Sequence, residues 1–321
     1  MDTTTFINLL SIIGILFLIM VTGYICRRIG LINADASKHL SRLIICLCQP
    51  MMIVGALVSK DFSTESLKRG LFFLLIGLLL HPLMAAFAFP FGRIFKDLNE
   101  RKVSIFALIF TNCGFIGLPI LETVFPGDGA FCGAFFLIGF HLYIWTLGIA
   151  ILSIGRPDIR LTPKKALLNY GTVPCLIGFL LYLLKAVLPV PAIVPNFCNY
   201  LGNLCMPVSV LITGSLLATQ PLLKMFKNPR LYLFNFFKLL LLPVLVAFVA
   251  KLCTLGMADN TRIILFCTVI AALPSASTIT MLSDMYDIDP GYAAQTVGSS
   301  SLLSLATLPL LYFLGDFIAK L

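Results

Sequence analysis

Four residues, Asn112, Gly114, Gly117 and Pro119, interrupt an apolar stretch that runs from about residue 102 to residue 125. The glycines weaken a helix, and the proline removes an amide donor and clashes with the preceding turn. Irregular backbone at membrane depth persists only where protein buries it or where it lines a wet cavity. Asn112 adds an amide that both donates and accepts hydrogen bonds. The pattern indicates either a kinked helix with close glycine packing or a discontinuous helix with a transport site at its unwound middle.

A second apolar stretch carries a similar interruption, the run from Leu273 to Ser277 with Pro274 at its centre. Proline suits the first position of a restarted helix, and serine can serve the freed amides. The second halves of both stretches would begin near the membrane midplane, so two helix N-termini would point at one spot. That spot favours an anion by roughly 0.3–1 kcal/mol for each terminus. The candidate substrate-binding residues are Asn112, Cys113, Gly114, Gly117, Pro119, Pro274, Ser275, Ser277 and, from a neighbouring segment, Gln49.

The composition excludes a soluble domain. The chain has 321 residues, of which 59% are hydrophobic and 12% charged, and its mean hydropathy is +1.01. About 20 consecutive apolar residues span a bilayer. The sequence predicts an all-α polytopic membrane protein with ten such segments: 7–26, 39–58, 69–91, 103–125, 130–154, 166–188, 197–219, 230–253, 262–285 and 292–315. Asp2 and the missing basic region before the first segment argue against a cleaved signal.

The net charge of +9 could indicate nucleic acid, but the positive residues cluster in alternate loops. With the N-terminus outside, fifteen lie in inner loops: Arg27, Arg28, Lys38, Arg42, Arg93, Lys96, Arg101, Lys102, Arg156, Arg160, Lys164, Lys165, Lys224, Lys227 and Arg230. Seven lie in outer loops or at the C-terminus: Lys60, Lys68, Arg69, Lys185, Lys251, Arg262 and Lys320. The positive-inside rule therefore predicts a multi-pass protein of the inner (plasma) membrane with both termini outside, and no nucleic-acid partner.

Landmarks recur along the chain at a nearly constant offset, which indicates two copies of five segments. The pairs are Pro50 with Pro207, Pro82 with Pro243, Asn112 with Pro274, and Gly129 with Gly291. Five is an odd number, so the second copy enters the membrane from the opposite side. We therefore predict two inverted five-helix repeats, residues 1–155 and 156–321.

Ionisable residues inside membrane segments are candidates for function by default. His141 could relay a proton or be a satisfied core histidine, and His81 could act in chemistry or relieve the kink at the proline after it. Lys238 could attract an anion or extend its ammonium to the inner surface. Glu122 and Asp284 are equivalent between the repeats, and interfacial solvation would explain both. We assign His141, Glu122, Asp284 and Lys238 to an ion-coupling or charge network.

Catalysis finds little support. The strings Gly-x-Ser-x-Gly, His-Glu-x-x-His, Gly-x-Gly-x-x-Gly and the Walker motif are absent. Most of the ten cysteines fall in apolar segments without metal-ligand spacing, which is typical of small buried hydrophobic residues. We expect no enzyme, no cofactor and no metal site. With no ATP site, active transport would have to use ion gradients.

The Asn-x-Gly-x-x-Gly-x-Pro pattern from Asn112 to Pro119 resembles that of the auxin efflux carrier family, and the Leu-Pro-Ser-Ala run at 273–276 is similar to its second motif. The chain looks like a bacterial member of this family, which includes plant PIN auxin carriers and malonate carriers. The resemblance implies broken, crossing helices 4 and 9, a homodimer and elevator-type motion. It also implies a scaffold domain of helices 1, 2, 6 and 7 and a transport domain of helices 3–5 and 8–10. Segment 9 lacks the asparagine of the plant carriers, which argues against auxin-like aromatic substrates.

The sequence thus favours a secondary carrier of small organic anions such as carboxylates, with membrane lipid around it. No arginine lies in either interruption, so helix dipoles and the polar side chains would meet the anion's charge. An inside-negative potential drives a monoanion outward, which makes export the easier direction. The alternatives are a cation- or proton-coupled exchanger of similar build and a membrane receptor that does not transport.

Overall fold

The computed structural model describes residues 3–159, 168–219, 227–257 and 259–321, and these residues form helices joined by short connections. In chain order the helices are α1 (Thr3–Arg28), α2 (Ala34–Leu43), η1 (Ile44–Cys48), α3 (Gln49–Val58), α4 (Thr64–Gly92), α5 (Leu98–Ile109), η2 (Cys113–Gly117), α6 (Leu118–Val124), α7 (Gly129–Tyr143), η3 (Ile144–Gly148), α8 (Ile149–Ser153), α10 (Thr172–Leu184), α11 (Ile193–Gly202), α12 (Cys205–Thr219), α14 (Pro229–Phe236), η4 (Phe237–Leu241), α15 (Leu242–Cys253), α16 (Asn260–Ala272), α17 (Thr278–Tyr286) and α18 (Pro290–Lys320). Elements labelled η are π-helical turns.

Within the described residues, seven helical stretches are long and apolar enough to cross a membrane. They match the predicted segments 7–26, 39–58, 69–91, 130–154, 197–219, 230–253 and 292–315 in position. The other three predicted segments correspond to shorter apolar helices. Two of these three are the segments with predicted interruptions, and the third begins among residues that the structure does not describe. The all-helical membrane fold is therefore confirmed.

Three of the four π-helical turns in the described residues end two residues before a proline. These turns are η1 before Pro50, η2 before Pro119 and η4 before Pro243. A proline cannot donate to the carbonyl four residues back, and its ring clashes with that carbonyl. A wider turn relieves the clash while the helix continues. These prolines therefore loosen the helices locally without ending them.

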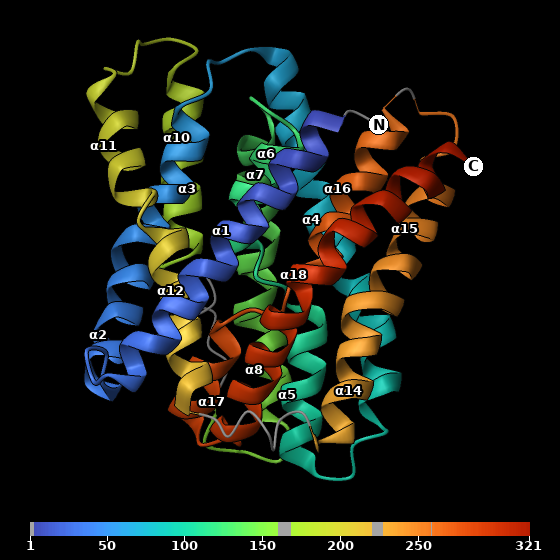
Figure 1. Cartoon of the computed structure of the whole chain (residues 1–321). Helices are drawn as coiled ribbons and strands as arrows, with labels where there is room; N and C mark the ends of the chain where they lie inside the picture. The colour runs from blue at the N-terminus through green and yellow to red at the C-terminus, as the bar shows by residue number, and fades with distance from the viewer. Residues whose placement is uncertain (1–2, 160–167, 220–226, 258) are drawn as a thin grey trace.

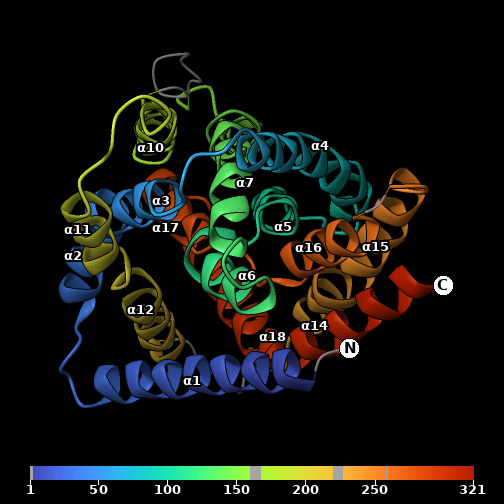
Figure 2. The same cartoon turned by 90° about the horizontal axis from the view of Figure 1, so that it is seen from above.

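Viewed from above, the helices form two groups (Figure 2). One contains α2, α3, α10, α11 and α12, with α1 along its edge, and the other contains α4, α5, α14, α15, α16 and α18, while α7 runs between them. Close helix crossings need small residues. An added Cβ at Gly214 would lie 1.9 Å from the Met20 carbonyl oxygen, and one at Gly23 would lie 2.0 Å from the Leu211 carbonyl oxygen. These glycines therefore fix α1 against α12.

Both chain ends lie toward the same end of the bundle, the upper end in Figure 1. The first helix starts there, and the connections from α3 to α4 and from α6 to α7 return to it.

Candidate functional site

The chain leaves the helical conformation at both predicted interruptions. After α5, Phe110 is extended, and helical turns resume at Cys113. After α16, Leu273 is extended, and α17 begins at Thr278. The discontinuous-helix interpretation is therefore correct, and a continuous kinked helix is not formed at either place. We refer to the segments 110–112 and 273–277 as the paired breaks.

The two breaks join each other through their backbones. The amide of Asn112 donates to the carbonyl oxygen of Pro274 at 2.8 Å, and the amide of Ala276 donates to the carbonyl oxygen of Phe110 at 2.9 Å. Thr111 and Ser275 thus form an isolated antiparallel β-bridge. Backbone groups freed from a helix inside a membrane protein need partners. Each break here supplies partners to the other, and so both stay unwound without reaching water.

Polar side chains surround the paired breaks. Asn112 is buried, and its amide group donates to the Ser277 hydroxyl over a long 3.5 Å contact. The Ser275 amide donates to the hydroxyl of Ser300 on α18 at 3.2 Å. The hydroxyls of Ser275 and Ser301 are buried without a partner among the described residues. Buried polar groups normally have hydrogen-bond partners. These two hydroxyls can therefore still bond a ligand or a water molecule.

Gln49 contacts the first break from the other helix group. It is buried at the start of α3, and its Nε2 lies 3.1 Å from the point where a Cβ on Gly114 would stand. At Gly117, a Cβ would lie 2.8 Å from the Leu273 side chain. These two positions favour glycine because the backbone of η2 comes close to both Gln49 and the second break. The structure thus brings Asn112, Cys113, Gly114, Gly117, Pro274, Ser275, Ser277 and Gln49 together.

A cavity of about 620 Å³ opens between α6 and the start of α7 on one side and α3, α11 and α12 on the other. Pro119 and Leu118 lie on one wall, Met52 and Met206 on the other, and Lys60 and Glu122 also line it. Such apolar walls with a few polar groups are typical of small-molecule sites. A second space of only about 20 Å³ lies against Pro274 and Ser301 and has room for about one water.

The two histidines within predicted membrane segments that the sequence singled out, His81 and His141, have different surroundings. His81 contacts the Gly77 carbonyl oxygen through Nδ1 at 2.6 Å, and the Tyr143 hydroxyl donates to the Leu78 carbonyl oxygen that Pro82 leaves free. Tyr143, rather than His81, therefore serves the carbonyl that the kink leaves free. The ring of His141 is buried on α7 against Gly171, where a Cβ would lie 2.0 Å from Nδ1, and its Nε2 has no partner among the described residues. His141 lies away from the paired breaks, between α7 and the start of α10.

The remaining charged candidates lie at different places in the fold and do not form one network among the described side chains. Lys238 is fully buried in η4, and its ammonium donates to the Leu108 carbonyl oxygen at 3.2 Å, so the side chain does not extend to the surface. Glu122 accepts from the amides of Gly127 and Ala130 at 2.6 and 2.9 Å, which caps the start of α7. Asp284 belongs to α17, but its side chain lies outside the described residues.

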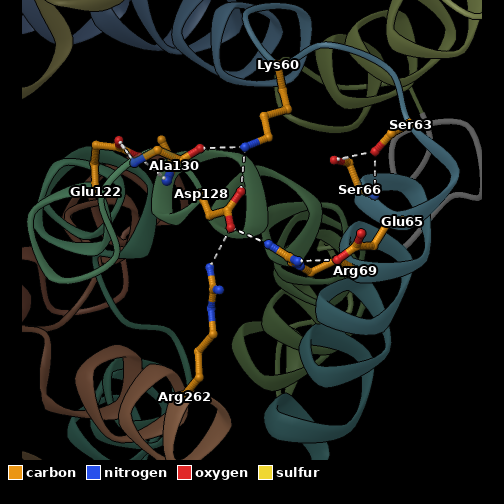
Figure 3. A network of polar contacts seen from close by, with 10 residues as sticks. Lys60, Ser63, Glu65, Ser66, Arg69, Glu122, Asp128, Ala130 and Arg262 are labelled. Carbon is orange, nitrogen blue, oxygen red and sulfur yellow. Dashed lines mark hydrogen bonds and ion pairs between the residues drawn. The ribbon is translucent and has the colours of Figure 1, made fainter. Parts of the chain in front are cut away.

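An ion cluster that the sequence did not reveal lies near the 620 Å³ cavity (Figure 3). The Asp128 carboxylate bonds Lys60 at 2.6 Å, Arg262 at 3.0 Å, and Arg69, which also bonds Glu65 at 2.9 Å. Burial on its own raises the pKa of the Asp128 carboxyl, but the hydrogen bonds from Lys60 and Arg262 and the nearby positive charges outweigh it and lower this pKa to about 2. Asp128 and its three cationic partners lie in or beside outer loops of the predicted topology. No spacing in the sequence indicates that they meet.

The described residues contain no group of three or more His, Cys, Asp or Glu side chains that could hold a metal ion. The arrangement around the paired breaks instead offers amides, hydroxyls and one buried ammonium. These are donors suited to an anion's oxygen atoms.

A family profile described as membrane transport protein matches residues 10–159 and 158–312. The chain belongs to this family. It is 23% identical to an uncharacterized transporter of Methanothermobacter thermautotrophicus over 303 residues, which make up 94% of this chain and 96% of that protein. It is 20% identical to an uncharacterized transporter of Methanocaldococcus jannaschii over 310 residues, 94% of this chain and 97% of that one. The family assignment confirms the resemblance to auxin efflux carriers, and membership makes this chain a transport protein rather than an enzyme.

Proposed function

We propose that the protein is a secondary carrier of small organic anions such as carboxylates. The observation that carries the proposal is the pair of joined breaks, with Asn112, Ser275 and Ser277 beside them and Gln49 facing them. Discontinuous helices in transporters commonly form the substrate site. The donors around these breaks, with no carboxylate bonded to either break among the described side chains, favour an anion over a cation.

We further propose ten membrane crossings in two inverted five-helix repeats, residues 1–155 and 156–321, with helices 4 and 9 broken and crossing. In this arrangement helices 1, 2, 6 and 7 form a scaffold, and helices 3–5 and 8–10 move as an elevator. Two observations support this division. Apart from α7, which runs between them, the helix groups in Figure 2 match it, and the 620 Å³ cavity lies between α3, α11 and α12 of the proposed scaffold and α6 and α7 of the proposed moving part. The family resemblance adds a homodimer.

The orientation with both termini outside rests on the charge bias of the loops. Single cysteines introduced into a cysteine-free variant, in the loops at 93–102 and 156–165, test it. They should react with an impermeant maleimide only after the cells are opened. Labelling of both loops in intact cells would reverse the orientation.

Potential-driven export fits this chemistry because an inside-negative potential moves a monoanion outward by roughly 2.3 kcal/mol per 100 mV. A proton-coupled exchanger is a second candidate, and the unpartnered Nε2 of His141 at the boundary between the helix groups is the observation that favours it. Flux in proteoliposomes that ignores an imposed potential and disappears in His141→Gln would replace uniport by proton coupling.

Thermal stabilisation of the purified protein is the first test, because a ligand that binds only the native state raises Tm. The panel contains acetate, pyruvate, malonate, succinate and matched amines. A carrier of organic anions should be stabilised by at least one carboxylate and by no amine. Stabilisation by sodium or by protons alone would support the exchanger, and the absence of any shift with the carboxylates would support a receptor that has lost transport.

A further inference from the structure

Lys238 places a positive charge inside the helix group that contains the paired breaks. The residue lies in η4, and its side chain is completely buried. An ammonium has three donors, and one contact, to the Leu108 carbonyl oxygen, is present at 3.2 Å. No carboxylate oxygen of the described residues lies within 4.0 Å of the Lys238 ammonium, which is the distance limit of a salt bridge. Among the described side chains, the charge of Lys238 is therefore without an acidic partner.

The contact with Leu108 also locates the charge relative to the proposed substrate site. Leu108 belongs to the last turn of α5, directly before the first break. The carbonyl end of a helix carries about half a negative charge and stabilises a cation there. Half a charge offsets only part of the lysine's, so a net positive charge remains beside the break.

A buried charge without a counter-ion destabilises a protein, and an ionisable side chain inside the membrane is a candidate for function. Lys251 makes the same kind of contact, donating to the Ile318 carbonyl oxygen at 2.8 Å, but it is only partly buried and lies near a helix end. Capping a helix therefore explains Lys251. Helix capping does not require the complete burial of Lys238.

We infer that Lys238 is the fixed counter-charge of the transported anion, an inference that rests on the proposed carrier function. A monoanion bound at the paired breaks would balance the charge of Lys238. Without a substrate, the positive charge of the protonated lysine is not balanced there. The protein should therefore select monoanions, and the return of the empty carrier should be the step that moves charge across the membrane.

This assignment separates two modes of transport. Exchange of labelled for unlabelled substrate uses only the loaded carrier, so its rate should not depend on the membrane potential. Net efflux requires the empty carrier to return, and an inside-negative potential draws a positively charged carrier back inward. Net efflux should therefore accelerate when the inside is made negative.

The test uses the wild-type protein in proteoliposomes with potassium gradients and valinomycin, and 14C-labelled pyruvate as a monoanion beside 14C-labelled malonate. Between 0 and −100 mV, net pyruvate efflux should rise roughly sevenfold if the rate-limiting barrier feels half of one charge crossing. Pyruvate exchange should change by less than about 1.5-fold, and malonate should bind more weakly than pyruvate. Exchange that depends on potential as strongly as net efflux would overturn the inference and leave the carrier function standing. Absence of saturable flux with both acids would overturn both.

Charge variants provide the second measurement. Lys238→Met should weaken pyruvate binding roughly tenfold and make exchange depend on potential, because the loaded carrier then bears the charge. Lys238→Arg should keep the wild-type voltage pattern, and Lys251→Met is the matched control that should leave it unchanged. A folded Lys238→Met variant whose exchange still ignores the potential would overturn the inference. If this variant does not fold, the inference is decided by comparing the voltage dependence of exchange and of net efflux in the wild-type protein.

Discussion

The paired breaks and the ion cluster around Asp128 both join parts of the chain that are far apart in sequence, but they use different groups. At the breaks, backbone amides of Asn112 and Ala276 bond backbone carbonyls across the crossing, and side-chain hydroxyls nearby remain unfilled. In the cluster, one carboxylate bonds three cationic side chains, Lys60, Arg69 and Arg262. The paired breaks therefore keep hydroxyl groups that can still form hydrogen bonds. In the ion cluster, the Asp128 carboxylate is already bonded to its three cationic partners.

The difference indicates which region can bind a ligand and which region holds elements together. A ligand at the breaks can find open donors without displacing the bonds that keep the breaks joined. In the cluster, Lys60 follows α3 in one helix group, and Arg262 belongs to α16 in the other. Asp128, which bonds both, directly precedes α7 between the groups. The cluster therefore ties the two groups at one end of the bundle, and motion between the groups would have to separate Lys60 from Asp128.

The largest effect is expected at the first region. Asn112→Ala should abolish or greatly weaken transport while the protein stays folded, because the backbone bonds of the breaks do not need the side chain. Loss of the amide removes its bond to the half-buried Ser277 hydroxyl and any bond to a ligand, at about 1–3 kcal/mol. Transport of the panel's best carboxylate and Tm are measured together. Asn196→Ala, on the exposed face of α11, is the control, and wild-type transport by Asn112→Ala would remove Asn112 from the site.

Gly114→Ala probes the contact between the break and the other helix group. The new methyl carbon would lie 3.1 Å from Gln49 Nε2, closer than nearly all such contacts, so the Gln49 side chain must shift. We expect a several-fold loss of transport and a modest drop in Tm. Gly14→Ala is the matched control, since no atom lies within 4 Å of its Cβ position. Equal behaviour of the two variants would show that Gln49 does not bear on the site.

The two regions also differ in how far the sequence could predict them. Glycines and a proline identify the first break and Pro274 identifies the second, because the effect of these residues on a helix is local. The bond between Asn112 and Pro274 could not be read from either stretch, since it depends on how the helices cross. The depth of Lys238 was left open for the same reason. Asp128 was missed because charged residues in loops are ordinary, and only the fold brings its three partners to one carboxylate.

The Asp128→Asn substitution tests the holding role of the cluster. It leaves Lys60, Arg69 and Arg262 without their shared carboxylate, so Tm should fall by roughly 2–5 °C. Transport should change by less than about tenfold, far less than for Asn112→Ala. Glu65→Gln is the control within the same cluster, because Glu65 is exposed and bonds only Arg69 among the described residues, and such surface pairs contribute little. If Asp128→Asn lost transport without any change in Tm, the cluster would belong to the substrate path.

The smallest expected effect is a change in Tm at low pH, and it tests whether the ionised form of Asp128 stabilises the fold. The pKa of this carboxyl is about 2, below the ordinary 3.8, so the carboxylate stabilises the folded protein fully above about pH 4, and this contribution is lost as the pH falls toward 2. The asparagine variant lacks it at every pH. The Tm difference between wild type and Asp128→Asn should therefore be constant from pH 7 to pH 5 and shrink between pH 4 and pH 2.5, while other carboxylates titrate in both proteins and cancel. Scanning fluorimetry in detergent follows both proteins in parallel. A difference that persists undiminished at pH 2.5 would mean that the shape of the Asp128 side chain, rather than its charge, holds the two helix groups together.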